Sequence, residues 1–304
     1  MRLSSRSAGT AGALLSLLGL PTNPVYAHSP VHAYVWSVDT ALVAIALLVT
    51  AMAYIVGIIK LWRASGGARG VAPWQVMLFS AGWLALVLAL VSPLDALGEA
   101  LFSAHMVQHE ILMLVAAPLL VLGKPLPAFV WALRPTWRRR VSQPMRIGFV
   151  QKTWHALTSP LAAWSLHAIA LWTWHIPLLF EAGLKNEWVH AAQHLSFLLA
   201  AVIFWWVALR RLQSGFAPLY VLTTAIHTGA LGALLTFAPM PLYPVYAAST
   251  LHWGLSALED QQLGGLIMWV PAGLTLVVAG VVLFDRWFAL TEHSGTASAG
   301  SRET

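Results

Sequence analysis

The chain has 304 residues, of which 59% are hydrophobic and only 9% are charged, with a formal net charge of +6. Soluble globular proteins carry about 25% charged residues, so this composition excludes that class and predicts an all-α integral membrane protein. The sequence contains no cysteine, which excludes disulfides, thiolate metal sites and thiol redox chemistry.

The N-terminal residues have the pattern of a secretory signal peptide. Arg2 and Arg6 supply its positive start, and the apolar stretch 11–20 is too short to span a membrane. Small residues at the end of this region form a cleavage site, so we expect a signal peptide over 1–27 and a mature chain that begins at His28, outside the cytoplasm. The alternative is an N-terminal segment that is not cleaved.

Seven apolar segments follow, each close to the roughly 20 residues that a helix needs to cross a bilayer. We expect helices, because backbone N–H and C=O groups in lipid must be hydrogen-bonded within the segment. The expected spans are 38–59, 74–92, 102–122, 160–177, 188–209, 218–238 and 262–284. They predict a seven-helix bundle in a membrane domain over 28–290, followed by a disordered cytoplasmic tail over 291–304.

The positive residues predict how these spans are oriented. They collect in the loops after the first, third and fifth spans and after the seventh: Lys60, Arg63, Arg69, Lys124, Arg134, Arg138, Arg139, Arg140, Arg146, Lys152, Arg210, Arg211 and Arg286. Loops rich in Lys and Arg stay in the cytoplasm, so we expect the N-terminus outside and the C-terminus inside. This pattern predicts a multi-pass protein of the plasma (inner) membrane whose basic loops contact lipid rather than nucleic acid.

Five histidines are expected near the outer ends of three spans. His105 and His109 begin the third span, His175 ends the fourth, and His190 and His194 begin the fifth. Residues four apart share a helix face, imidazole is a common metal ligand, and ionisable groups inside a membrane usually have a function. We therefore predict one metal site built from these five side chains. The alternative is a set of interfacial histidines bonded to lipid head groups or to neighbouring carbonyls.

Further residues are candidates for the same site. Met106 and Met113 add thioethers, which together with imidazole suit copper, although for Met113 filling of the core is the preferred interpretation. Glu110 could orient an imidazole, handle a proton, or remain neutral and hydrogen-bonded inside the bundle. His252 lies in the last outer loop, and Asp260 could reach the histidines or cap the seventh span.

Short motifs occur along the chain in a defined order. They are His105-Met-Val-Gln-His109, Ala117-Pro118 with Gly123-Lys124-Pro125, Trp174-His175-Ile-Pro177, His190 to His194 running into Phe204-Trp205-Trp206, and Asp260-Gln261-Gln262 with Gly265-Leu-Ile-Met268-Trp269. In their order and spacing, over about residues 75 to 285, the chain resembles the seven-span CtaG-type assembly factors of caa3-type cytochrome c oxidase. It is not similar to the single-span copper chaperone of the same name, which relies on cysteine.

This resemblance implies a protein that helps to mature a haem-copper oxidase through copper supply, with the oxidase subunits as its partners. We expect an assembly factor rather than an enzyme and assign no catalytic residue, since the sequence has no P-loop, no dinucleotide fingerprint and no Gly-x-Ser-x-Gly motif.

Two other functions remain open at this point. One is a redox protein that binds haem b through histidines on different helices. Histidine pairs on one helix argue against it, because both rings of a pair would lie on the same side of the macrocycle. The other is a transporter of copper or protons, with Glu110, His167 and His227 as an inward path. Otherwise His167 and His227 are hydrogen-bonded contacts of the bundle.

Overall fold

The computed structural model describes residues 38–143, 147–212 and 215–300, and these are helices joined by short loops, with no strand among them. The expected signal peptide and His28 lie outside the described residues. In chain order the helices are α2 (Val38–Ser65), α3 (Pro73–Leu90), α4 (Pro93–Ala100), α5 (Phe102–Glu110), the π-helix η1 (Ile111–Ala116), α6 (Ala117–Leu122), α7 (Leu126–Ala132), α8 (Pro135–Ser142), α9 (Gly148–Leu157), α10 (Pro160–Trp174), α11 (Pro177–Lys185), α12 (Glu187–Trp206), the π-helix η3 (Val207–Arg211), α13 (Phe216–Thr236), the 3₁₀ turns η4 (Pro244–Tyr246) and η5 (Thr250–Trp253), and α14 (Ala257–Gly300).

Six of the described helical segments are long and apolar enough to cross a membrane. They are Thr40–Ser65, Pro73–Leu90, Phe102–Leu122, Glu187–Arg211, Phe216–Thr236 and Ala257–Thr291, and they coincide with six of the seven expected spans. The remaining span, expected at 160–177, is represented by α10, which has 15 residues and is shorter than these six. A multi-pass membrane protein is therefore supported, whereas the membrane span expected at 160–177 and the orientation stay predictions.

Prolines and polar caps set where the helices begin. A proline occupies the first position of α3, α4, α10 and α11, where its missing N–H costs no helical hydrogen bond. The Ser92 hydroxyl caps α4, and the side chain of Asn186 accepts hydrogen bonds from the backbone N–H groups of Trp188 and Val189 at the start of α12. Each of the short helices α4 and α11 is followed, after a single residue, by a histidine-bearing helix.

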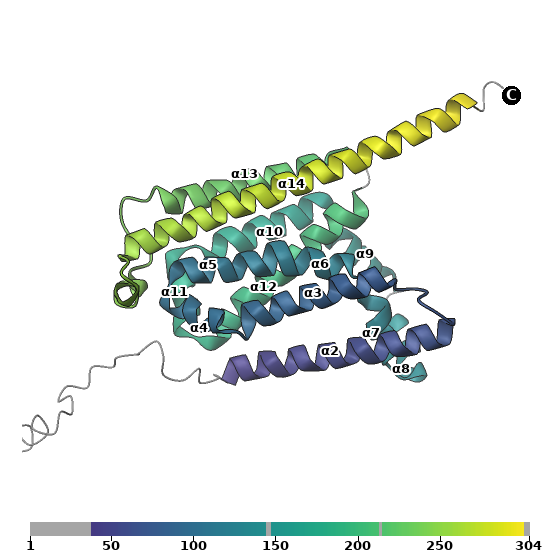
Figure 1. Cartoon of the computed structure of the whole chain (residues 1–304), viewed down its shortest axis with the longest axis horizontal. Helices are drawn as coiled ribbons and strands as arrows, with labels where there is room; N and C mark the ends of the chain where they lie inside the picture. Colours follow the sequence, from purple (N-terminus) through teal and green to yellow (C-terminus); the bar gives the residue numbers. More distant parts are fainter. Residues whose placement is uncertain (1–37, 144–146, 213–214, 301–304) are drawn as a thin grey trace, which may run out of the picture. The chain divides into compact units, whose positions relative to one another are not determined.

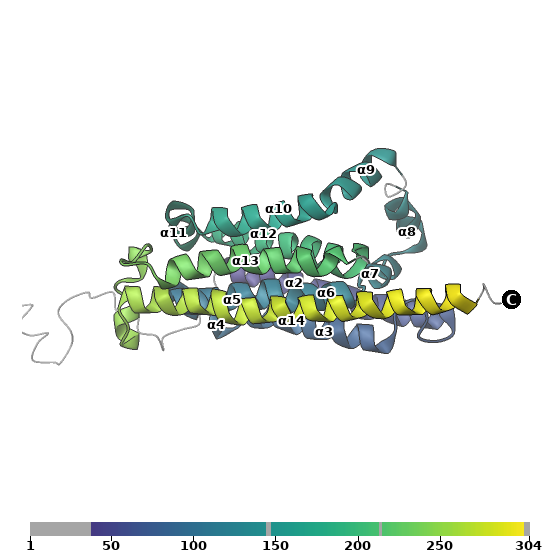
Figure 2. The same ribbon diagram turned by 90° about the horizontal axis from the view of Figure 1, so that it is seen from above.

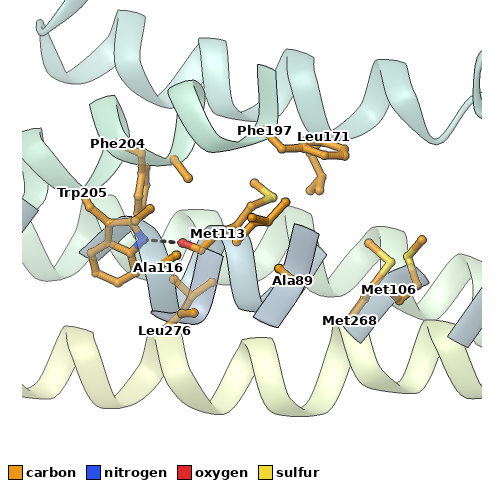
Figure 3. Packing of buried hydrophobic residues seen from close by; sticks show 14 of the residues in the cluster. Ala89, Met106, Met113, Ala116, Leu171, Phe197, Phe204, Trp205, Met268 and Leu276 are labelled. Carbon is orange, nitrogen blue, oxygen red and sulfur yellow. Dashed lines mark hydrogen bonds between the residues drawn. The ribbon is translucent and has the colours of Figure 1, made fainter. Parts of the chain in front are cut away.

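The third expected span is interrupted by a π-helical turn for a local reason. In this turn the N–H of Ala117 bonds to the carbonyl of Leu112, and the next residue, Pro118, has no N–H to donate. The carbonyl of Met113 is instead satisfied by the indole N–H of Trp205 in α12, at 2.9 Å (Figure 3). The π-turn thus connects the helix that carries His105 and His109 to the helix that carries His190 and His194.

Helices α13 and α14 lie side by side in both ribbon views (Figures 1 and 2). Glycines let their backbones approach closely: a Cβ placed on Gly265 would lie 2.6 Å from the backbone nitrogen of Thr236, and one on Gly232 would lie 2.9 Å from the Gly265 carbonyl. Small residues at such contacts are the usual way in which membrane helices pack. Helix α14 continues to Gly300, through residues 291–300, which the sequence analysis assigned to a disordered tail.

The outward surface of α2 is apolar, as a helix in contact with lipid requires. Its exposed side chains include Leu42, Ile45, Leu48, Val49, Met52 and Ile55. A water-soluble protein rarely exposes an apolar surface of this extent. The interior is packed with large side chains from several helices, among them Phe197, Phe204 and Leu276 (Figure 3).

Candidate metal site

The five histidines singled out in the sequence lie together inside the described part of the chain, and we call them the histidine cluster: His105, His109, His175, His190 and His194. The ring centroids of His105 and His109 on α5 are 4.3 Å apart, and those of His190 and His194 on α12 are 4.2 Å apart. Across the two helices, His109 and His194 are 5.3 Å apart. All five side chains are at most 9% exposed.

Three of these side chains could share one ion. His105, His109 and His194 each offer a ring nitrogen, and these three nitrogens all lie within 4.8 Å of one another. Imidazole nitrogens bind metals at about 2 Å, so modest side-chain rotations would bring the three onto one ion. The spacing of the residues in sequence places each pair on one helix face, and the packing of α5 against α12 joins the pairs.

The hydrogen-bonding state of the cluster fits a metal. Neither ring nitrogen of His109 has a hydrogen-bond partner, and the same is true of Nε2 of His175 and of His194. Buried polar atoms are normally paired, and each unpaired one costs free energy. A bound ion would take up the one lone pair that each neutral imidazole carries, so the residues present are suited to hold one.

His175 lies at the edge of the cluster, and one of its two ring nitrogens already makes a hydrogen bond. Its Nδ1 lies 2.7 Å from the backbone carbonyl of Leu171, which can only accept, so Nδ1 carries the hydrogen and Nε2 keeps its lone pair. The hydroxyl of Tyr243 donates to the His175 carbonyl at 2.8 Å, and burial raises the pKa of Tyr243, which keeps this donor protonated. The His175 ring centroid is 6.3 Å from that of His109, so this residue is a more distant ligand candidate.

Aromatic rings surround the cluster. Phe180 lies with its ring centroid 5.0 Å from that of His105, and Phe197 lies 4.6 Å from His109. Both phenylalanines are fully buried. These rings limit the access of water, which strengthens electrostatic interactions at the site.

Two polar side chains that the sequence analysis did not select also reach this region. The Gln108 amide donates to the carbonyl of Ala89 at 2.6 Å and to the Asp95 carboxylate at 2.7 Å. An oxygen of Asp95 and ring nitrogens of His190 and His194 all lie within 4.8 Å of one another. In the sequence, Asp95 lies between two expected spans, and no helical spacing relates it to either histidine of α12.

Of the other candidates, Glu110, His252 and Asp260 do not belong to either of the two groups of histidine and acid ligand atoms found among the described residues. Met106 is fully buried and packs against α14, where it lies near Met268 (Figure 3). Met113 lies deeper in the core, and Glu110 lines a separate cavity with His167. His252 is exposed in η5.

Asp260 caps a helix, although not the one expected. Its carboxylate accepts hydrogen bonds from the backbone N–H groups of Phe102, at 2.6 Å, and Ser103, at 3.1 Å, and also from the Ser103 hydroxyl. These groups open α5, whereas the sequence analysis considered a cap on the seventh span. A carboxylate at a helix N-terminus is favoured by the free N–H groups and by the helix dipole. Asp260 therefore holds α5 in place rather than contacting the histidine cluster.

Comparison with known proteins gives a family match over most of the chain. Residues 52–289 match the family described as cytochrome c oxidase caa3 assembly factor. Curated relatives include uncharacterized proteins of Mycobacterium bovis and Mycobacterium tuberculosis, each 28% identical over 265 residues, and one of Mycobacterium leprae, 27% identical over 270 residues. Each match covers 83% of this chain but 39% of the relative, so the chain spans about two fifths of the length of these proteins. No solved structure matches the chain.

Proposed function

Since the chain belongs to the cytochrome c oxidase caa3 assembly factor family, we propose that it binds copper at the histidine cluster and aids delivery of that copper to the oxidase. The family supports a role in assembly rather than in catalysis. The proposed place of action is the plasma (inner) membrane, with the cluster near the outer face and haem-copper oxidase subunits as partners. Lys and Arg in the opposite loops support this orientation.

One observation carries the copper part of the proposal. Ring nitrogens of His105, His109 and His194 converge within 4.8 Å, and both nitrogens of His109 are buried without a hydrogen-bond partner. Imidazole binds copper well, and a set of neutral nitrogens without thiolate suits an ion that must later be released. The three converging imidazoles are neutral ligands, so the only charge added at this position would be that of the ion itself.

Metal analysis of the purified protein tests this proposal. The full chain is loaded with Cu(I) in detergent, desalted and analysed for copper per chain. The double variant His109→Ala/His194→Ala should lose most of its bound copper, because it removes two of the three converging ligands while the apolar spans still direct insertion. The variant His252→Ala removes an exposed histidine outside the cluster and should keep the copper content of the wild type. Unchanged copper in the double variant would end the proposal.

A second function, an inward path for protons or copper, is favoured by one further feature. Glu110 and His167 line a cavity of about 20 Å³, together with Met113 and Thr228. This volume is enough for about one water molecule. Uptake of copper or acid into sealed proteoliposomes, compared between wild type and Glu110→Gln, would detect such a path. Transport that the variant abolishes would favour it over delivery at the surface.

A further inference from the structure

The histidine cluster is encoded by a motif that occurs twice in the chain. The first copy consists of Gly98, His105, Gln108 and His109, and the second consists of Gly183, His190, Gln193 and His194. Every residue of the second copy follows its counterpart by the same 85 positions, from Gly98 to Gly183 and from His109 to His194. A shared spacing at four polar or small positions predicts that the two segments have the same local structure.

The structure places the two copies in matching surroundings. Each copy is built from an apolar helix, a short helix that begins with proline, and a histidine-bearing helix: α3, α4 and α5 in the first, and α10, α11 and α12 in the second. The short helices α4 and α11 lie at the same end of the helices in both views (Figures 1 and 2).

The glycine and the glutamine of the motif meet in the same way in both copies. A Cβ placed on Gly98 would lie 3.1 Å from Oε1 of Gln108, and one placed on Gly183 would also lie 3.1 Å from Oε1 of Gln193. The two units thus share this contact and the same order of helices along the chain. Both features are typical of parallel internal repeats in membrane proteins. The cluster is therefore formed where two copies of one unit meet.

The two copies differ at one position that faces the histidines. Three residues before the glycine stands Asp95 in the first copy and Phe180 in the second. Each of these side chains lies against the histidines of the other copy: Asp95 beside His190 and His194, and Phe180 with its ring 5.0 Å from that of His105. One end of the cluster thus carries a carboxylate, and the other end carries an apolar ring.

We propose that this difference creates two ion positions within the cluster, a proposal that rests on the copper-binding function above. The first position consists of His105, His109 and His194, and its neutral nitrogens beside an apolar ring favour Cu(I). The second consists of Asp95, His190 and His194, and two imidazoles with a carboxylate are a ligand set for divalent ions such as Zn²⁺. The amide of Gln108, which donates to Asp95 at 2.7 Å, orients the carboxylate of the second position.

Separate affinities for two metals test this proposal on the purified full chain. Zn(II) is measured by competition with a chromophoric chelator, and Cu(I) by competition with a Cu(I)-specific chelator under reductant. Asp95→Asn keeps the size of the side chain and an oxygen for the Gln108 amide but removes the charge. It should weaken Zn(II) binding about tenfold or more, while the Kd for Cu(I) stays within about twofold. His109→Ala should give the reverse pattern.

Two variants serve as controls. Glu181→Gln changes an acid of α11 that pairs with Lys185 at 2.8 Å, and it should leave both affinities unchanged. His190→Ala removes a different ligand of the second position and should lower the affinity for Zn(II) but not that for Cu(I). This variant therefore tests the proposal even if Asp95→Asn does not fold.

The outcomes are distinguishable. Equal losses of Zn(II) and Cu(I) in Asp95→Asn and in His190→Ala would show a single position and overturn the proposal. Unchanged Zn(II) binding in both variants would exclude Asp95 and His190 as ligands and overturn it as well. Failure of the wild type to bind Cu(I) at all would contradict the proposed function itself.

Discussion

At the residue scale, the Asp260 carboxylate fixes the start of the helix that carries His105 and His109. It accepts two backbone N–H bonds at Phe102 and Ser103 and is fully buried. Free N–H groups at a helix start must be satisfied when water is excluded. A residue from the last helix thereby determines where two candidate ligands lie, although it is 157 residues from Ser103 in sequence.

We predict that Asp260→Ala destabilises the protein by about 1–3 kcal/mol, because it leaves the buried N–H groups of α5 without an acceptor. Unfolding in detergent, followed by circular dichroism against temperature or denaturant, measures this change. The matched control is Asp285→Ala, which removes an exposed acid from the same helix and should change stability by less than about 0.5 kcal/mol. Equal stability of the two variants would show that the cap contributes nothing.

The two histidine pairs of the cluster were predictable because each pair obeys helical spacing within one segment. The role of Asp260 and the approach of Asp95 to His190 were not, since both contacts join residues far apart in sequence through the packing of separate helices. The repeat of Gly98, His105, Gln108 and His109 at a constant offset was readable in the sequence. It is short and is embedded in otherwise different apolar segments, so hydropathy alone does not reveal it.

At the element scale, the π-turn η1 depends on a donor from another helix. Pro118 cannot donate a backbone hydrogen bond, and the carbonyl of Met113 takes the indole N–H of Trp205 instead. Without that donor, a buried carbonyl in a water-free region would remain unpaired. The contact also holds α12 against the span that begins with α5, which is the arrangement that brings His109 and His194 together.

We predict that Trp205→Phe lowers stability by about 1–3 kcal/mol and weakens Cu(I) binding, since it keeps an aromatic ring but removes the donor to Met113. Thermal unfolding and chelator competition measure the two effects. Trp188→Phe, at an exposed position of the same helix, should leave both unchanged. If Trp205→Phe matched the wild type in both measurements, the indole N–H bond to the Met113 carbonyl would contribute neither to stability nor to Cu(I) binding.

The contact between α13 and α14 gives a second prediction at this scale. Gly265→Ala should destabilise the protein by about 1–3 kcal/mol, because the added Cβ would lie 2.6 Å from the Thr236 nitrogen and 2.7 Å from the Gly232 carbonyl, and both atoms belong to the backbone. Gly273→Ala on the same helix is the matched control, since nothing lies within 4 Å of its Cβ. It should be neutral or stabilise by up to about 1 kcal/mol. The difference in unfolding temperature between the two variants is the measurement.

Most helix positions follow from apolar length, and the largest difference is at α14, which runs from Ala257 to Gly300 beyond both ends of the span expected at 262–284. A smaller difference arises at a proline. One span is expected at 160–177, whereas α10 ends at Trp174 and α11 begins at Pro177. The expected span ends at the proline that opens α11, but no short helix was expected after it. That short helix belongs to the second copy of the repeated unit and carries Phe180, which lies against His105.

At the scale of the whole molecule, the two repeated units place four histidines and their surrounding groups at one end of the described helices. Neither unit alone assembles the three nitrogens of His105, His109 and His194, which come from both α5 and α12. The site should therefore exist only in the folded protein. Loss of either unit should remove it, even though each unit keeps one histidine pair.

The last prediction concerns the cell in which the protein acts. Deletion of its gene should lower cytochrome c oxidase activity at limiting copper, and added copper should restore part of that activity. The reason is mass action: a copper donor raises the local supply of metal, and abundant free metal can replace it. A scaffold or a haem protein offers no such bypass.

The measurement is oxidase activity over a series of copper concentrations in the deletion strain, complemented with wild type, with His109→Ala/His194→Ala, or with His252→Ala. The cluster variant should behave as the deletion does, whereas the variant outside the cluster should behave as the wild type does. Copper outside the cytoplasm is measured in parallel, so that poor metal entry is recognised. Lost activity that copper does not restore would favour a scaffold, because binding partners would then matter more than metal supply. Full activity of the deletion strain at limiting copper would contradict a role in oxidase assembly for this chain.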